Sequence, residues 1–128
     1  MTISSLALTG AVGVAGAFGA LARYLLGRFI AERAGAAFPW GTFAINISGS
    51  FFIGLLFALA GQKLLASWLQ VILATGFLGG YTTFSTMSWE GLQLARGGSS
   101  RQSLLYLCAS VAFGLLAATL GIGLGWLL

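Results

Sequence analysis

The chain has 128 residues, of which six are basic and two are acidic, so its formal net charge is +4. Hydrophobic residues make up 59% of the sequence and the mean hydropathy is +1.00, values that exclude a soluble domain of this size. The basic residues are expected to meet membrane lipid headgroups, and their excess does not indicate a nucleic-acid partner.

Four uncharged runs divide the chain, at residues 1–22, 34–62, 64–89 and 102–128. Each supplies the roughly 20 apolar residues that cross a bilayer core of about 30 Å. The sequence therefore predicts a single all-α domain, residues 1–128, that is an integral membrane protein with four transmembrane helices. The alternative for the first run is a cleaved signal peptide, but no basic residue precedes its apolar stretch.

The first helix is expected over residues 5–30, followed by a loop. Four of its glycines recur every third residue, namely Gly10, Gly13, Gly16 and Gly19. We interpret them as one ridge that another helix approaches closely, because glycine lets membrane helices pack tightly. Arg23 follows this ridge near the end of the helix.

The second helix is expected over residues 40–61. Polar and small residues repeat every fourth position on it and share one face, namely Thr42, Asn46, Ser50 and Gly54. The amide of Asn46 offers two N–H donors, the kind of group that replaces water around an anion crossing a membrane. The alternative is an ordinary hydrogen bond between helices. Asn46 taken alone favours this alternative, whereas Ser50 one turn later and Tyr106 and Ser110 on the last helix bring the two interpretations into balance.

The third helix is expected over residues 66–96, with a break near residues 79–83. Three glycines and a cluster of hydroxyls in mid-membrane are poor material for an unbroken helix. Non-helical backbone at membrane depth persists where protein, water or an ion satisfies it. Carbonyls of Gly79 and Thr82 would suit a cation, and the alternative is a glycine-permitted kink without an ion.

Beyond the break, Phe84 and Met87 share one face of the helix, whereas Thr82, Thr86 and Glu90 repeat every fourth residue on another, with Ser85 between the two. An aromatic ring has a positive edge, so Phe84 held edge-on can stabilise an anion without trapping it. The alternatives are plain packing against lipid for Phe84 and hydrogen bonds to the preceding helical turn for the hydroxyls.

The last helix is expected over residues 102–126 and carries a stripe of polar and small residues, namely Ser103, Tyr106, Ser110 and Gly114. The sequence contains no histidine, its single Cys108 has no basic partner, and its two acids lie far apart. Acid–base catalysis, nucleophilic catalysis and side-chain metal ligation all need such groups together. We therefore expect no enzyme.

The most distinctive parts of the sequence are residues 76–88 and the run Pro39-Trp40-Gly41-Thr42 that leads to Asn46. Over nearly its whole length the chain resembles the Fluc (CrcB-type) fluoride channels. The resemblance implies passive export of fluoride from the cytoplasm across a bacterial plasma membrane. It also implies an antiparallel, dual-topology homodimer with two pores and a structural Na⁺ at its centre.

The resemblance further implies roles for individual residues. Carbonyls of Gly79 and Thr82 would hold the Na⁺, and Arg23 would lie near the aqueous vestibule. The residues implied to line the pore or contact the anion are Asn46, Phe84, Ser85, Thr86, Glu90, Tyr106 and Ser110. Met87 stands where the family has a second phenylalanine, and it has no positive ring edge.

The distribution of charge departs from the pattern expected of a dual-topology chain. Four arginines flank one side of the membrane, namely Arg28, Arg33, Arg96 and Arg101, whereas Lys63 flanks the other. By the positive-inside rule, this bias favours a single orientation with the termini outside. The antiparallel dimer is therefore implied by the resemblance and not by the charges.

A small four-helix, proton-coupled multidrug exporter is the alternative function. Such a transporter needs a membrane-embedded acid that binds a cation and exchanges protons. The first helix has no acid in its apolar part, and Glu90 lies toward one end of the third helix. A purely structural membrane subunit would not need polar stripes on three helices.

Overall fold

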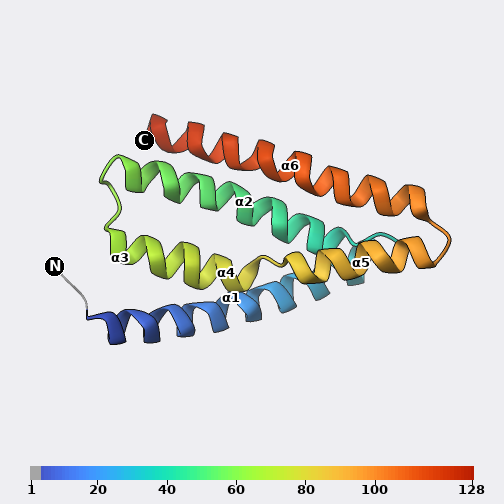
Figure 1. The fold of residues 1–128 in the computed structure, drawn as a ribbon, viewed down its shortest axis with the longest axis horizontal. Helices are drawn as coiled ribbons and strands as arrows, with labels where there is room; N and C mark the ends of the chain where they lie inside the picture. Colours follow the sequence, from blue (N-terminus) through green and yellow to red (C-terminus); the bar gives the residue numbers. More distant parts are fainter. Residues whose placement is uncertain (1–3) are drawn as a thin grey trace.

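The computed structural model describes residues 4–128, which form four long helical rods joined by short connections at alternating ends (Figure 1). The first, second and fourth rods are α1 (Ser5–Ala34), α2 (Trp40–Gly61) and α6 (Ser100–Leu127). The third rod consists of α3 (Ser67–Gln70), the π-helix η1 (Val71–Leu78), α4 (Gly79–Tyr81) and α5 (Phe84–Arg96). The predicted fold of four helices with a broken third is confirmed.

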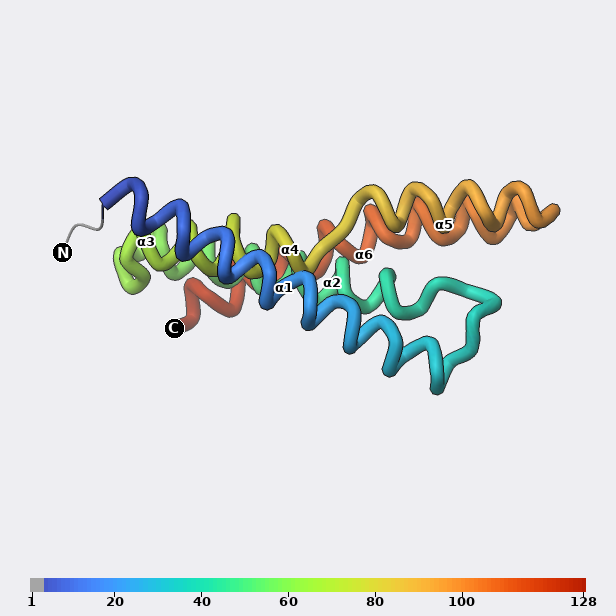
Figure 2. The backbone as a smooth tube through the Cα atoms, turned by 90° about the horizontal axis from the view of Figure 1, so that it is seen from below, coloured from blue at the N-terminus to red at the C-terminus, as the bar shows by residue number. Residues whose placement is uncertain are grey.

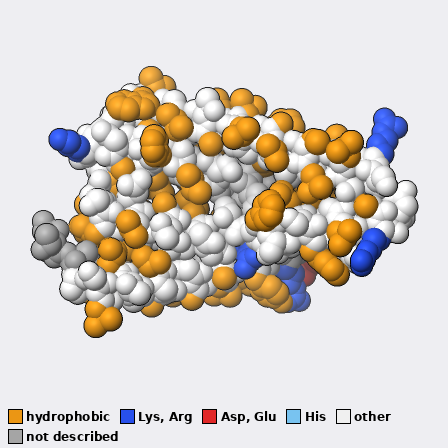
Figure 3. Space-filling view, viewed as in Figure 1, with side chains coloured by type: hydrophobic (Ala, Val, Ile, Leu, Met, Phe, Trp, Pro, Cys, Tyr) orange, Lys and Arg blue, Asp and Glu red, His pale blue; other side chains and the backbone are white. Residues whose placement is uncertain are grey.

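Helices α1, α2 and α6 are each long and apolar enough to span a membrane. Figure 3 shows hydrophobic side chains over the middle of one face and basic side chains at its two ends and along one edge. Large apolar side chains such as Phe57 and Leu115 are exposed on the molecular surface. Such a surface is stable in lipid, where the surroundings are as apolar as the side chains.

Helix α1 ends four residues later than predicted, at Ala34. Nε of Arg28 donates to the carboxylate of Glu32 at 3.0 Å, and the Arg33 guanidinium lies 3.7 Å from the centroid of the Phe29 ring. Both pairs are four residues apart and stabilise the last turns of the helix. Gly35, with a φ of 82°, then ends it.

Glycines bring α1 into close contact with the third rod. A Cβ on Gly19 would overlap the carbonyl of Phe77, and a Cβ on Gly80 would overlap the carbonyl of Gly16. The predicted ridge is wrong for Gly10 and Gly13, where a Cβ would meet no atom of residues 4–128 within 4 Å. A spacing of three turns the helix face by about 60° each time, so the four glycines do not stay on one side.

Helices α2 and α6 also approach closely through glycine. A Cβ on Gly54 would overlap the carbonyl of Ala118, and a Cβ on Gly121 would overlap the carbonyl of Phe51. At the end of this pair, Nε2 of Gln62 donates to the carbonyl of Gly125 at 2.7 Å. The two helices therefore form one closely packed unit against which the broken rod is placed.

The break in the third rod lies at Thr82 and Thr83, inside the predicted range. Both residues are extended, with ψ values of 159° and 120°. Figure 2 shows that beyond this point α5 runs beside α6, whereas the end of α1 and the start of α2 lie on the other side of the molecule. The break thus divides one end of the bundle into two helical pairs.

Candidate functional site

A pocket of about 630 Å³ lies between these two pairs of helices. We call it the vestibule. Its charged and hydroxyl-bearing lining residues are Arg23, Tyr24 and Arg28 of α1, Thr42 of α2, Thr83 at the break, and Thr86 and Glu90 of α5. Gly35, Phe38 and Pro39 of the loop between α1 and α2 also line it. The structure therefore brings the candidate residues Arg23, Thr86 and Glu90 around one cavity.

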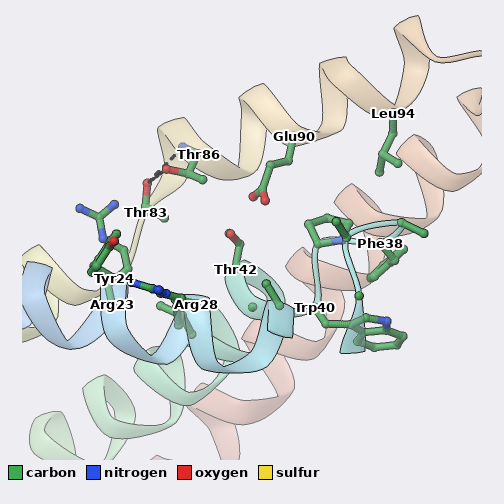
Figure 4. A pocket seen from close by; sticks show the side chains of 18 of the residues that line it. Arg23, Tyr24, Arg28, Phe38, Trp40, Thr42, Thr83, Thr86, Glu90 and Leu94 are labelled. Atoms are coloured by element: carbon green, nitrogen blue, oxygen red, sulfur yellow. Dashed lines mark hydrogen bonds between the residues drawn. The ribbon is translucent and has the colours of Figure 1, made fainter. Parts of the chain in front are cut away.

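The charges of the vestibule are divided between its two walls. Figure 4 shows Arg23 and Arg28 on the α1 side, and Glu90 directed toward Thr42. The Glu90 carboxylate accepts a hydrogen bond from the Tyr106 hydroxyl at 3.3 Å. An anion that enters meets positive charge from α1, while a tyrosine hydroxyl engages the opposing acid.

Asn46 joins α2 to the break through both ends of its side-chain amide. Nδ2 donates to the carbonyl of Thr83 at 2.9 Å, and Oδ1 accepts from the Thr83 N–H at 2.9 Å. Asn46 is therefore compatible with both interpretations, the hydrogen bond between helices and the donor to an anion. Its amide forms an interhelical contact, and Nδ2 carries a second hydrogen that these two bonds do not use.

The hydroxyl of Thr83 organises the start of α5. Its Oγ1 accepts from the Thr86 N–H at 3.1 Å, which is an N-cap of the helix, and it donates to Thr86 Oγ1 at 3.1 Å. Ser85 Oγ lies 3.4 Å from the same atom. Three hydroxyls thus form a connected group, and two of the residues that carry them, Thr83 and Thr86, line the vestibule.

These contacts change the hydrogen bonding of the two carbonyls expected to hold a cation. In an unbroken α-helix, the Thr83 N–H would donate to the carbonyl of Gly79, and the Thr86 N–H to the carbonyl of Thr82. Here the first donates to Asn46 and the second to the Thr83 hydroxyl. Both carbonyls are released from their helical donors.

The structure separates the remaining candidates on the third rod. Phe84 is 77% exposed on the molecular surface, Ser85 is exposed, and Met87 is half-buried. The predicted face of Thr82, Thr86 and Glu90 is wrong for Thr82, because the chain is extended there. Thr82 Oγ1 instead donates back to the carbonyl of Leu78 at 2.9 Å, and a Cβ on Gly49 would overlap the methyl of Thr82.

On α6, the predicted stripe faces inward. Tyr106 is fully buried, with its ring edge-on to Phe38 at a centroid distance of 5.4 Å. Ser103 Oγ donates to the carbonyl of Gly91 at 2.6 Å. Ser110 is buried too, and within residues 4–128 its Oγ has no hydrogen-bond partner. A buried hydroxyl without a partner is uncommon and retains its capacity to donate.

The family model for CrcB-like proteins, described as Camphor Resistance (CrcB), matches residues 10–122. That range includes all the candidate residues described above. The chain belongs to the CrcB-like family. With its apolar spans, this CrcB-like chain is a multi-pass integral membrane protein.

Named relatives match over nearly their whole length. The chain is 50% identical to the "Fluoride-specific ion channel FluC 1" of Symbiobacterium thermophilum over 117 residues, covering 90% of this chain and 94% of that protein. It is 47% identical to the "Fluoride-specific ion channel FluC" of Acidobacterium capsulatum, covering 89% and 92%. A protein of the same name from Thermus thermophilus is 46% identical, covering 89% and 90%.

Sequence reasoning missed the central position of Thr83 in this CrcB-like chain. One signal was present, since threonine is a preferred N-cap residue and Thr83 immediately precedes the amphipathic start of α5. Thr42 was expected on the same face of its helix as Asn46. Its position opposite Glu90 depends on how the two helical pairs diverge. That divergence is a tertiary property.

Proposed function

We propose that this protein is a fluoride-selective channel that lets fluoride leave the cytoplasm passively through the bacterial inner membrane. The observation that carries the proposal is the vestibule, where Arg23 and Arg28 face an entrance that continues to the uncharged hydroxyls of Thr83 and Thr86. The relatives named as fluoride-specific ion channels support it.

Selectivity follows from the kind of donors along this route. Fluoride gives up its water only where hydrogen-bond donors replace it. The hydroxyls of Thr83 and Thr86 line the vestibule, and the remaining Nδ2 hydrogen of Asn46 and Ser110 Oγ are proposed to supply further donors beyond it, all without a fixed positive charge that would hold the ion. Larger chloride needs more room and gains less from each hydrogen bond, so a narrow route with many donors disfavours it.

The pore is proposed to be completed by a second copy of the chain in an antiparallel homodimer with two pores. Phe84 and Ser85 support this arrangement, because both are exposed instead of facing their own chain's vestibule. In a homodimer with closed symmetry, each copy can offer these side chains to the other. The edge of the Phe84 ring would then contact the anion.

A structural Na⁺ is proposed at the break, held by the carbonyls of Gly79 and Thr82. The site fits such a hard cation, because carbonyl oxygens are suitable ligands and the hydrogen bonds described above have released both of these. When bound, the cation would supply positive charge that stabilises the non-helical backbone. The residues of the chain then need only keep that backbone extended.

The proposed function is tested by fluoride efflux from liposomes that contain the purified protein, with chloride efflux as the control. Passive fluoride efflux far above chloride efflux is expected. Comparable chloride flux would overturn the assignment. Fluoride flux that requires a pH gradient would instead favour a proton-coupled transporter.

A further inference from the structure

We propose that Thr83, with Asn46 as its partner, is the positioning residue that creates the cation site and couples it to the anion route. The proposal rests on the proposed Na⁺ at the break and explains how the chain prepares that site. It concerns two N–H groups, those of Thr83 and Thr86, and the acceptors that each of them uses.

The first N–H is withheld from Gly79 by the second helix. Oδ1 of Asn46 accepts it at 2.9 Å, and Nδ2 of the same amide donates to the Thr83 carbonyl at 2.9 Å. These paired bonds hold the Thr83 peptide as a neighbouring strand would, which is compatible with its φ of −151° and ψ of 120°. Without the amide, the acceptor that a continuous α-helix would offer this N–H is the Gly79 carbonyl.

The second N–H is withheld from Thr82 by the side chain of Thr83. Oγ1 accepts the Thr86 N–H at 3.1 Å, so α5 begins at a cap and does not continue backward through the break. Thr83 is buried, with 8% of its surface exposed. One carbonyl is thus freed through the backbone of Thr83 and the other through its hydroxyl.

The pair of residues is linked to the anion route through Thr83. Thr83 Oγ1 donates to Thr86 Oγ1 at 3.1 Å and lies 3.4 Å from Ser85 Oγ, and Thr83 lines the vestibule. Asn46 has its second Nδ2 hydrogen outside the Thr83 contact. A change that lets the break return toward a helix would therefore disturb the cation ligands and the anion donors together.

The experiment measures the unfolding temperature of the purified full-length protein as a function of Na⁺ concentration, with N-methylglucamine chloride keeping the ionic strength constant. A cation that binds only the folded state raises this temperature. We compare the wild type with Asn46→Leu and Thr83→Val, which keep side-chain volume and remove the hydrogen bonds. Thr83→Ser restores the hydroxyl.

Wild type is expected to be stabilised by Na⁺. Asn46→Leu and Thr83→Val should need about 10- to 100-fold more Na⁺ for half of that effect, the usual result of losing partners that orient metal ligands. Thr83→Ser should stay near wild type. Ser48→Ala is the matched control, because Ser48 Oγ contacts the Tyr81 hydroxyl at 2.9 Å and not the Thr83 peptide.

Equal Na⁺ responses in wild type and Thr83→Val would overturn the proposal. If Asn46→Leu does not fold, the comparison of Thr83→Val with the wild type decides, since it replaces only the hydroxyl by a methyl group, and Thr83→Ser shows whether the hydroxyl suffices without the methyl group. A wild type that is indifferent to Na⁺ would remove both the cation site and its positioning residue. Passive fluoride efflux from the same preparation remains a separate test of the proposed function.

Discussion

The hydroxyl of Tyr106 on α6 donates to the carboxylate of Glu90 on α5 across 3.3 Å, and this contact fixes the acid in the wall of the vestibule. Tyr106 is held in turn by the edge-on ring of Phe38 from the loop before α2. Glu90 is the one acidic residue that lines the vestibule among residues 4–128. Its position therefore depends on three separate segments of the chain.

Tyr106→Phe should reduce fluoride flux roughly tenfold. A hydrogen bond to a charged group contributes about 1.5 kcal/mol, and roughly 1.36 kcal/mol corresponds to a factor of ten in rate. Without the hydroxyl, the Glu90 carboxylate is free to turn into the anion route. Efflux measured at equal protein density checks this. The double variant Tyr106→Phe, Glu90→Gln should recover most of the flux, and failure to recover would mean that the hydroxyl itself serves the anion.

Gly19→Ala should destabilise the protein by about 1–3 kcal/mol, because the added methyl group overlaps the Phe77 carbonyl of the third rod. Gly13→Ala on the same helix is the matched control and should be neutral, since the methyl group meets open space. Thermal unfolding in detergent measures both. Equal destabilisation by the two variants would mean that replacing any glycine of this helix has the same effect, and that the contact between Gly19 and the third rod is not its cause.

The two membrane orientations should be populated about equally if the dimer is antiparallel. In a Cys108→Ser background, Ser99→Cys and Leu64→Cys place a thiol at opposite ends of the bundle. An impermeant maleimide added to intact spheroplasts should label about half of each variant. Labelling of Leu64→Cys alone would mean that the arginine bias imposes one orientation, and would contradict the antiparallel dimer.

Met87→Phe should change fluoride flux only modestly. Methionine fills the volume of a ring and adapts to its surroundings, while Phe84 and the connected hydroxyls still contact the anion. Paired efflux measurements at equal dimer density compare the two proteins. A large gain from Met87→Phe would show that the positive edge of a second ring is essential, and that methionine limits conduction in this chain.

Much of the fold follows from short-range properties of the sequence. The charges at Arg23, Lys63 and Arg101 divide the chain into its apolar spans, and the span lengths follow from bilayer thickness. The break was predictable, because glycine and hydroxyl residues destabilise a helix locally wherever they cluster. The inward stripe of α6 follows from helical periodicity, and burial of Ser103, Tyr106 and Ser110 confirms it.

The features that prediction missed depend on partners distant in sequence. The Thr83 peptide finds Asn46 across 37 positions, and periodicity on either helix does not indicate that contact. Thr82 does not lie on its predicted face, because the extended residues interrupt the helix between Thr82 and Thr86. A spacing of four residues across this break therefore does not place two residues on the same face. The π-helix before the break also changes which residues share a face of the third rod, and the residue types did not predict it.

Both ends of the described chain lie beside the turn between α2 and α3, whereas the vestibule lies toward the opposite end of the bundle (Figure 1). In an antiparallel pair, the chain ends of one copy would therefore stand next to the entrance of the other. A bulky domain fused to Leu128 of one copy would obstruct the entrance of the other copy and leave the entrance of the fused copy open. Mixing tagged and untagged chains would then give complexes with one hindered path and one free path.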